Sequence, residues 1–439
     1  MTANPLSPRR RRQAGLALLA AVALTSVLTA CDAAATSQPT TPPSAVSAAA
    51  DLTGADLTGD AAARQGRLAA VAQQNLDAGV PGVIIRVDDG HGQPIEVARQ
   101  APWSKADHVL AAGDRFRMGS NTKTMVATVV LQLVAEHRLQ LTDPVEKLLP
   151  GLVPNGSAIT LRMLLNHTSG LFNYTNDPEV FTSFIGQDNR AWTPRELLAA
   201  AVRHDPLFAP GTSYTYSNTN YIALGLIAEK TTGHALGDLI QERIARPLHL
   251  KDTYLATDTH LDPAKNPSLA HGYEPDAAHI GPLLPPGTPA GTAFAGQARP
   301  AGYVDTTSIN ASTEWAAGNM VSTTQDWARF DSALLSGKLL PPAELKEMRT
   351  TVAEESEFPD RRYGLGLEQV TTPCGTVWGH NGQVPGYSSE AYTDDSGKRT
   401  VSIFTSTIFG HIPPQAVTAK KALITTAVCA MLGKPVPAS

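Results

Sequence analysis

The chain has 439 residues, of which 42% are hydrophobic and 17% charged, so it can bury a large core and is not a disordered chain. Thirty-five Lys and Arg stand against 40 Asp and Glu, which gives a formal net charge of -5. This mildly acidic balance gives no support for a phosphate-binding surface, and we expect no nucleic-acid partner.

The N-terminus has the pattern of an export signal that ends in a lipid-attachment motif. Four arginines, residues 9–12, precede an apolar stretch over residues 14–27 and small residues before Cys31. This pattern resembles a bacterial lipobox, in which the cysteine becomes the first mature residue and carries acyl chains. We therefore expect residues 1–30 to be a lipoprotein signal peptide. The protein would be exported and anchored through Cys31 to the outer face of the cytoplasmic membrane, with an ordinary cleaved signal as the alternative.

A polar segment separates this signal from the folded chain. Residues 31–65 are mainly Ala, Thr, Ser and Pro, which bury too little apolar surface to offset their ordering entropy, so we predict a flexible tether. Residues 66–435 are predicted to form one domain. It opens with an amphipathic stretch over residues 67–76 and a β-hairpin over residues 83–87 and 95–97.

The first candidate catalytic motif is Ser120-x-x-Lys123, at the start of a helical pattern over residues 124–136. Residues three apart share a helix face, so the Lys123 amine can reach the Ser120 hydroxyl, and the positive helix end favours an alkoxide. The alternative is a capping serine beside an exposed lysine. Among all the lysines, only Lys123 has a serine three places before it.

The second candidate motif is Tyr216-x-Asn218, which follows a proline-glycine turn. A phenol whose pKa is lowered by Lys123 can accept the Ser120 proton, and an asparagine amide can hold a substrate carbonyl. A rival motif stands at Tyr174 and Asn176, but the turn before Tyr216 and the apolar helix after it favour Tyr216. Apolar spacing over residues 194–202 and 221–229 predicts further helices, so residues 119–340 read as a helical lobe.

The third candidate motif is His380-Asn381-Gly382, just before a second predicted hairpin. Gly382 permits close backbone approach, an exposed strand edge can dock substrate and lend an N–H to an oxyanion hole, and His380 adds a titratable donor. The alternative for His380 is an ordinary hydrogen-bonding surface histidine.

The C-terminal part mirrors the N-terminal part. A hairpin over residues 389–392 and 400–405 precedes a helical pattern over residues 416–432. Strands at both ends suggest one shared sheet, so we predict an α/β fold: an antiparallel sheet flanked by helices, with an inserted all-helical lobe. Cys374 and Cys429 lie in an exported chain, where we expect a disulfide rather than two buried free thiols.

Taken in order, Ser-x-x-Lys, Tyr-x-Asn and His-x-Gly resemble the signature of the serine β-lactamase and penicillin-binding D-alanyl-D-alanine peptidase superfamily. Segments over residues 164–171 and 317–323 match as well, and the resemblance covers about residues 67–432. The tyrosine is similar to that of the class C branch. The histidine, with residues 363–367 and the cysteine pair, resembles Streptomyces-type D-alanyl-D-alanine carboxypeptidases. The resemblance implies a β-lactamase/transpeptidase-like fold and acylation of Ser120 by a penultimate D-alanine. Lys123 and Tyr216 would then transfer protons, and the strand at His380 would bind substrate.

Three residues depart from the family pattern where the terminal carboxylate of a peptide would bind. They are Asn381, Gln383 and Glu368, the last at a position where the resemblance leads us to expect arginine. A carboxylate binds well to arginine and poorly beside glutamate, although Arg361 or Arg362 could substitute.

These observations lead us to expect a serine acyl-enzyme hydrolase, first of all a D-alanyl-D-alanine carboxypeptidase acting on peptidoglycan stem peptides. The alternatives are an esterase, a β-lactamase or a D-aminopeptidase on the same scaffold, and lastly a non-catalytic penicillin-binding sensor lipoprotein. The chain has no zinc-protease or phosphate-loop motif, so we expect no metal and no cofactor. We also expect a monomer, whose partners are a peptidoglycan peptide or small acyl substrate and, through its lipid, the membrane.

Overall fold

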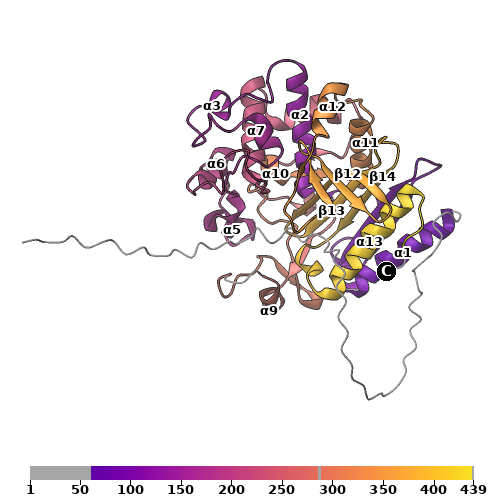
Figure 1. Ribbon diagram of the computed structural model, residues 1–439. Helices are drawn as coiled ribbons and strands as arrows, with labels where there is room; N and C mark the ends of the chain where they lie inside the picture. Colours follow the sequence, from indigo (N-terminus) through magenta and orange to yellow (C-terminus); the bar gives the residue numbers. More distant parts are fainter. Residues whose placement is uncertain (1–60, 285–287, 438–439) are drawn as a thin grey trace, which may run out of the picture.

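The computed structural model describes residues 61–284 and 288–437, and its centre is an eight-stranded antiparallel sheet (Figure 1). The strand order is β2-β1-β14-β13-β12-β11-β10-β9. The strands are β1 (Gly82–Asp88), β2 (Ile95–Gln100), β9 (Val352–Ala353), β10 (Arg361–Tyr363), β11 (Glu368–Thr372), β12 (Gly375–Val384), β13 (Tyr387–Thr393) and β14 (Thr400–Thr405). Because β1 pairs with β14, both ends of the chain contribute to one sheet, as the sequence predicts.

Two helices, α1 (Ala61–Asp77) and α13 (Pro414–Leu432), cover one face of this sheet and lie side by side in Figure 1. Apolar residues of both helices and alternate residues of β1, β12 and β14 form one continuous core. A disulfide between Cys374 and Cys429 ties the β11–β12 turn to the end of α13, as predicted. By the chain-entropy relation, a loop of 55 residues stabilises the fold by about 4 kcal/mol.

The other face of the sheet carries the larger lobe. Its helices are α2 (Thr122–Ala135), α3 (Val145–Leu148), α4 (Leu161–Leu165), α5 (Pro178–Phe184), α6 (Pro194–Val202), α7 (Asn218–Thr232), α8 (Leu236–Ile240), α9 (Ala277–Ile280), α10 (Trp315–Gly318), α11 (Thr324–Leu335) and α12 (Pro342–Met348). Helix α2 lies at its centre, buried along most of its length because other elements pack on it from several sides.

The predicted fold class is confirmed, with one correction inside the lobe. The lobe is not all-helical, because it also contains two small three-stranded sheets. Their strands are β3 (Phe116–Arg117), β4 (Tyr254–Leu255) and β8 (Met320–Ser322) in one, and β5 (Tyr273–Pro275), β6 (Gln297–Arg299) and β7 (Tyr303–Asp305) in the other. Strands of two or three residues show no alternation long enough to be read from a sequence.

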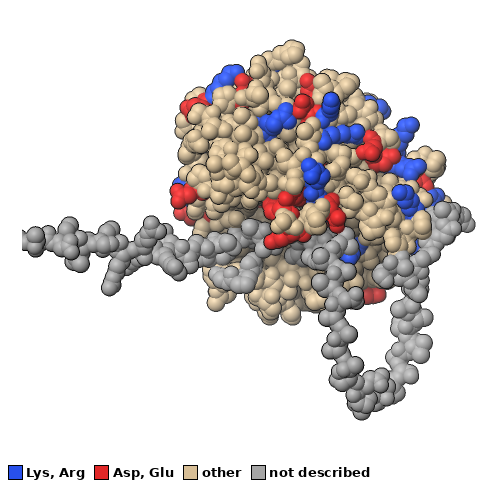
Figure 2. Space-filling model, viewed as in Figure 1, with Lys and Arg blue, Asp and Glu red and all other residues tan. Residues whose placement is uncertain are grey.

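The predicted tether and the folded domain meet a few residues earlier than expected. Helix α1 begins at Ala61 rather than after residue 65, because the alanine-rich start favours a helix and Arg64 pairs with Asp89. The predicted signal peptide, Cys31 and the rest of the tether lie outside the described residues. Within the described part of the chain, no helix is both long and apolar enough to cross a bilayer. Basic and acidic side chains are interspersed over the face shown in Figure 2.

Candidate active site

The turn that carries Ser120 lies between the start of α2 and the main sheet. Ser120 lies in the 3-10 turn η2 (Gly119–Asn121), which runs directly into α2. The turn is tied to β13 because the Ser389 hydroxyl donates to the Met118 carbonyl (2.8 Å) and accepts from the Asn121 amide (2.8 Å). The Ser120 hydroxyl is therefore held at the positive end of a buried helix.

Lys123 lies one turn along α2, fully buried, and its amine contacts only neutral oxygen atoms. Its Nζ is 2.9 Å from Ser120 Oγ, 2.7 Å from Asn218 Oδ1 and 2.7 Å from the Ala317 carbonyl oxygen. Burial lowers the pKa of Lys123 to about 7, although the charges of Glu314 and Glu368 act in the opposite direction. A neutral amine can donate to the two carbonyl-type oxygens and accept the hydroxyl proton of Ser120.

Tyr216 lies beside Ser120 and Lys123, on the segment that leads into α7. Its hydroxyl is next to that of Ser120, but no well-formed hydrogen bond joins it to any described residue. The Lys123 amine is 4.9 Å from the centre of its ring. Burial raises the pKa of Tyr216 well above its usual value, and Ser120 opposes this only in part. The expectation of a phenol with a lowered pKa is therefore wrong, because burial raises the pKa of Tyr216 and keeps the phenol neutral.

The rival tyrosine is engaged elsewhere. Tyr174 is fully buried, and its hydroxyl donates to the Thr313 carbonyl at 2.6 Å. Asn218, by contrast, is at the site, where its amide oxygen accepts from Lys123. That oxygen is committed to Lys123, so only the amide N–H₂ remains for a substrate.

Strand β12 brings the third motif against the nucleophile. A Cβ at Gly382 would lie 2.0 Å from the Met118 carbonyl oxygen and 2.9 Å from the Ser120 nitrogen, so only glycine permits this approach. Strand β11 pairs only with the first half of β12, up to Gly379, which leaves residues 380–384 with one unpaired edge.

The residue after Gly382 supplies a backbone donor at this edge. Val384 and Tyr387 close the β12–β13 hairpin as a hydrogen-bonded pair, so the next pair, Gln383 with Ser388, is not hydrogen-bonded. The Gln383 N–H consequently points away from β13, towards the free edge and the turn at Gly119. Together with the Ser120 N–H it can form an oxyanion hole. Sequence reasoning treated Gln383 only as a departure from the family pattern, but its position one residue past Gly382 was a sufficient signal for this backbone role.

His380 is a structural part of the strand rather than a donor to substrate. Its Nε2 accepts from the Tyr363 hydroxyl at 2.8 Å, and its Nδ1 donates to the Asn381 carbonyl. Burial, helped by the charge of Lys123, lowers the pKa of His380 to about 3, so the ring stays neutral. The expectation of a titratable His380 donor near the leaving group is therefore wrong, because both ring nitrogens are already bonded.

Glu368 and the two candidate arginines do not form a carboxylate grip at Ser120. Glu368 is buried, with its carboxylate 3.3 Å from Arg361 Nη1 and 3.6 Å from His380 Nδ1. Arg362 donates to Thr351 on the surface. The suggestion that either arginine replaces the missing cation is wrong, since both side chains are used elsewhere.

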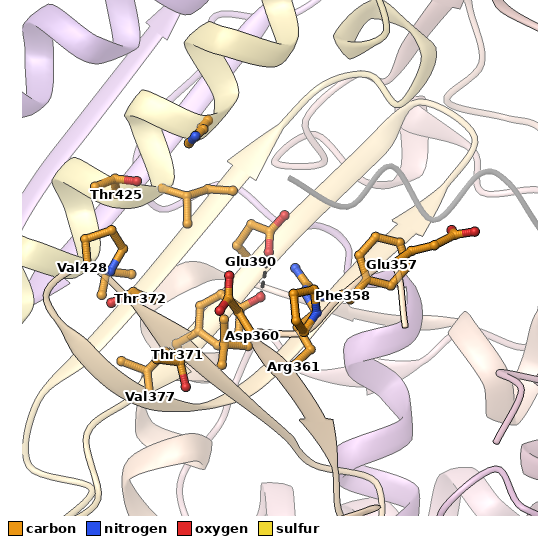
Figure 3. A pocket seen from close by; sticks show the side chains of 16 residues that line it. Glu357, Phe358, Asp360, Arg361, Thr371, Thr372, Val377, Glu390, Thr425 and Val428 are labelled. Carbon is orange, nitrogen blue, oxygen red and sulfur yellow. Dashed lines mark hydrogen bonds between the residues drawn. The ribbon is translucent and has the colours of Figure 1, made fainter. Parts of the chain in front are cut away.

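Arg361 faces a cavity beneath α13, on the side of the sheet away from Ser120 (Figure 3). Its walls come from β10 to β13, from α13 and from the loop before β10, and they carry charges of both signs. The lining residues are Glu357, Phe358, Pro359, Asp360, Arg361, Val370, Thr371, Thr372, Pro373, Val377, Glu390, Tyr392, Lys421, Ile424, Thr425 and Val428.

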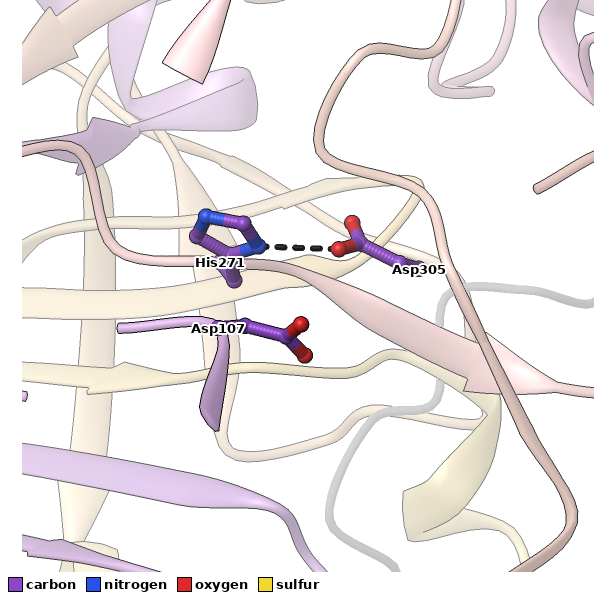
Figure 4. Close-up of side chains that lie close together, drawn as sticks. All are labelled: Asp107, His271 and Asp305. Atoms are coloured by element: carbon purple, nitrogen blue, oxygen red, sulfur yellow. Dashed lines mark hydrogen bonds and ion pairs between the residues drawn. The ribbon is translucent and has the colours of Figure 1, made fainter. Parts of the chain in front are cut away.

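One cluster in the described chain has the residue types of a metal site. The ligand atoms of Asp107, His271 and Asp305 lie within 4.8 Å of one another (Figure 4). The guanidinium of Arg299, however, bridges the two carboxylates, 2.8 Å from Asp107 and 3.1 Å from Asp305. Because Arg299 supplies the positive charge, these residues form a saturated ion network and do not fit a metal ion.

Comparisons with known proteins place this chain in one family. The family model described as Beta-lactamase matches residues 68–422. A D-stereospecific amidohydrolase from Streptomyces sp. is 36% identical, with a TM-score of 0.68 over 82% of this chain and 98% of that one. The D-amino acid amidase of Ochrobactrum anthropi SV3, solved with D-phenylalanine, has a TM-score of 0.70 at 24% identity over 83% of this chain and 98% of that one.

Among curated relatives, a penicillin-binding protein of Bacillus subtilis is 27% identical over 284 residues, which is 64% of this chain and 58% of the relative. The chain thus spans 62% and 58% of the length of two curated relatives it matches.

Proposed function

This chain belongs to the beta-lactamase family of serine hydrolases, and from that premise we propose that it is an amidohydrolase that cleaves D-aminoacyl amides or peptides. The acyl group would be carried on Ser120. The observation that carries the proposal is the charge around Tyr216, and the similarity to a D-stereospecific amidohydrolase supports it.

The proposed first half-reaction uses the contacts described above. The neutral Lys123 amine takes the Ser120 proton as Oγ attacks the substrate carbonyl, and the N–H groups of Ser120 and Gln383 stabilise the oxyanion. The intermediate collapses when the Tyr216 hydroxyl donates its proton to the leaving amine. The proton on Lys123 then returns to Tyr216, and water repeats the sequence in reverse on the acyl-enzyme.

Acidic groups gather beside Tyr216. Glu355 Oε1 accepts from the Tyr216 backbone N–H at 3.3 Å, and the neighbouring Glu354 has a buried carboxylate oxygen without a hydrogen-bond partner in the described chain. Glu354 and Glu355 both raise the pKa of Tyr214, after burial itself, which indicates that their field reaches this part of the site. Arg361 is held by Glu368. In their ionised form the carboxylates of Glu354 and Glu355 attract a protonated substrate amine and repel a free C-terminal carboxylate. Burial raises the pKa of Glu354 to about 7 and also raises the pKa of Glu355.

The same reasoning weakens the expectation of a D-alanyl-D-alanine carboxypeptidase, whose substrate ends in a carboxylate. That reading still has support in the motif set and in the similarity to a penicillin-binding protein. It requires a cation at the substrate end, but Arg361 is paired with Glu368, Arg362 is bonded to Thr351, and the Lys123 amine is already bonded to three oxygens.

The deciding experiment compares D-alaninamide, L-alaninamide, N-acetyl-D-alaninamide and a peptide ending in D-alanyl-D-alanine as substrates of residues 61–439. We expect release of ammonia from D-alaninamide, much slower release from the L and N-acetylated amides, and complete loss in Ser120→Ala. Release of D-alanine from the peptide, with no reaction on the amides, would instead select the carboxypeptidase.

A fluorescent penicillin provides a second test of the acyl-enzyme. A label that persists on the wild type and disappears in Ser120→Ala indicates slow deacylation, whereas rapid release of hydrolysed drug indicates a β-lactamase. Ser388→Ala is the matched control, because Ser388 also lies beside a lysine, and we expect it to keep the label.

We further propose that the protein is anchored outside the cytoplasmic membrane through acylated Cys31, with the polar segment after it as a tether. Cys31→Ala should abolish incorporation of radiolabelled palmitate and release the protein from washed membranes. The monomeric state stays a prediction, which light scattering tests.

A further inference from the structure

His167, outside the three motifs, has an unusual place in the chain. It follows α4 and lies in the left-handed backbone region, with φ of 60°, although its side chain is completely buried. A residue other than glycine in this region costs roughly 1 kcal/mol, so the conformation persists only where surrounding contacts hold it.

Those contacts include hydrogen bonds to the residues on either side of Tyr216. The Thr215 N–H donates to the His167 carbonyl at 3.1 Å, and the Ser217 N–H donates to His167 Nδ1 at 3.1 Å. Asn220 of α7 donates to the same nitrogen at 3.0 Å. Because Nδ1 accepts these bonds, the ring proton is on Nε2.

The imidazole also packs against the Tyr216 ring itself. The two ring centres are 4.3 Å apart with an interplanar angle of 30°, and the Tyr363 ring meets the imidazole edge-on at 4.7 Å. Tyr363 in turn donates to His380 of β12. His167 thus touches the phenol of the second motif directly and the strand of the third motif through one residue.

The ring carries no charge that would disturb Lys123. Burial lowers the pKa of His167 well below its usual value, and the nearby Lys123 acts in the same direction. The groups that face it are Lys123, His380 and the hydroxyl-bearing rings of Tyr216, Tyr221 and Tyr363. A neutral ring without access to solvent is suited to holding a neighbour in place rather than to moving protons.

We propose that His167 is the positioning residue for Tyr216, fixing the phenol in the geometry from which it donates its proton to the leaving group. The inference rests on the proposed acyl-enzyme chemistry of Ser120. A displacement of 1 Å at a reacting group can lower a rate about 100-fold, and the three contacts of His167 remove that freedom from Tyr216.

The test is a double-mutant cycle in the rate of Ser120 acylation by a fluorescent penicillin, whose leaving amine needs a proton. His167→Asn keeps a residue that tolerates left-handed φ but removes the ring. In the wild-type background we expect His167→Asn to slow acylation about 100-fold. In the Tyr216→Phe background we expect it to slow acylation less than about threefold, because His167 acts through a hydroxyl that this variant lacks. Equal losses in both backgrounds would overturn the proposal.

The matched control is His249→Asn, at an exposed histidine that also has a left-handed φ, 56°. We expect its acylation rate to stay within about twofold of the wild type, since it removes the same side chain at a distance from the site. If His167→Asn fails to fold, His167→Gln takes its place in the cycle.

A measurement without substrate separates this proposal from the proposed function. In protein labelled with 3-fluorotyrosine, the ¹⁹F resonance of Tyr216 is assigned by its disappearance in Tyr216→Phe. We expect it to shift and broaden in the His167 variant and to stay unchanged in His249→Asn. An unchanged resonance overturns the role of His167. Failure of the wild type to form any acyl-enzyme overturns the proposed function alone.

Discussion

In the described part of the chain, two buried lysines each contact a serine, one on each face of the main sheet. Lys123 Nζ lies 2.9 Å from Ser120 Oγ on the side of the large lobe. Lys420 Nζ lies 3.0 Å from Ser388 Oγ under α13. The two distances are nearly the same, so closeness of an amine to a hydroxyl does not by itself identify a nucleophile.

What differs is the rest of each environment. Lys420 has a carboxylate partner, Glu390, at 3.3 Å, and both charges are almost completely buried. Lys123 has only neutral oxygens within hydrogen-bond distance, and its serine is next to a phenol, a free strand edge and a helix start. Lys420 is thus paired with a carboxylate, whereas Lys123 has none within hydrogen-bond distance, and burial lowers the pKa of Lys123 to about 7.

Substitution of Lys123 or Lys420 by methionine should give the largest difference between the two pairs, and the difference should appear in the acylation rate. In Lys123→Met we expect acylation of Ser120 to slow by about 1,000-fold or more, because no other described group can take the hydroxyl proton. In Lys420→Met we expect a change of less than about threefold. Both rates are measured by stopped-flow with a chromogenic β-lactam, and equal losses would show that the distinction drawn from the environments is wrong.

Stability should respond in the opposite order. Lys420→Met leaves Glu390 as an unpaired buried charge, which costs about 3–5 kcal/mol in the free energy of unfolding. Lys123→Met removes a buried amine without a counter-ion, and we expect the protein to be as stable as the wild type or more so. Urea unfolding followed by circular dichroism measures both, with Lys421→Met, the next residue of α13, as the control.

The pH dependence should distinguish the pairs as well. Acylation should rise about tenfold per pH unit below pH 7 and level off above it, since the neutral Lys123 amine is the reactive form. The unfolded chain keeps this proton up to its usual pKa of 10.5, whereas the folded chain releases it near pH 7. Raising the pH between these values therefore stabilises the wild type relative to Lys123→Met, by at most about 1.4 kcal/mol per unit. A pH profile of the rate that is flat across neutrality would contradict this assignment.

The smallest expected effect concerns the acidic groups beside Tyr216. Glu355→Gln should lower kcat/KM for D-alaninamide by roughly tenfold, because one partly buried attraction for the substrate amine is lost. The rate with the uncharged p-nitrophenyl acetate should change by less than about twofold. Glu357→Gln, in the same loop but exposed, is the control. Equal losses with both substrates would indicate a distortion of Tyr216 rather than a lost charge.

Local patterns account for most of what the sequence predicted. The two hairpins are predicted from the alternation of apolar residues, and α13 from their helical spacing. The contact between Ser120 and Lys123 is predicted from the geometry of one helical turn. The choice of Tyr216 over Tyr174 also rested on local features, a rigid turn followed by an apolar helix.

Non-local contacts account for the rest. Whether Glu368 faces substrate or Arg361 depends on the register of β10 against β11. The direction of the Gln383 N–H depends on which residue of β13 faces Gln383. The position of His167 beside Tyr216 depends on a contact with Ser217, which lies 50 residues further along the chain. The pKa of Tyr216 depends on the burial of its hydroxyl group, which no motif encodes.

The pairing of β1 with β14 also has a consequence for biosynthesis. Val83 in β1 pairs with Thr405 in β14, so β1 cannot pair with β14 until almost the whole chain has left the ribosome. Until then the apolar residues Val83, Ile85 and Val87 and an unpaired strand edge are exposed, which makes incomplete chains prone to aggregate. A stop codon before β14 would leave Ser120, Lys123, Tyr216 and Gly382 in the product. We expect such a fragment to be insoluble, and not merely a slower enzyme.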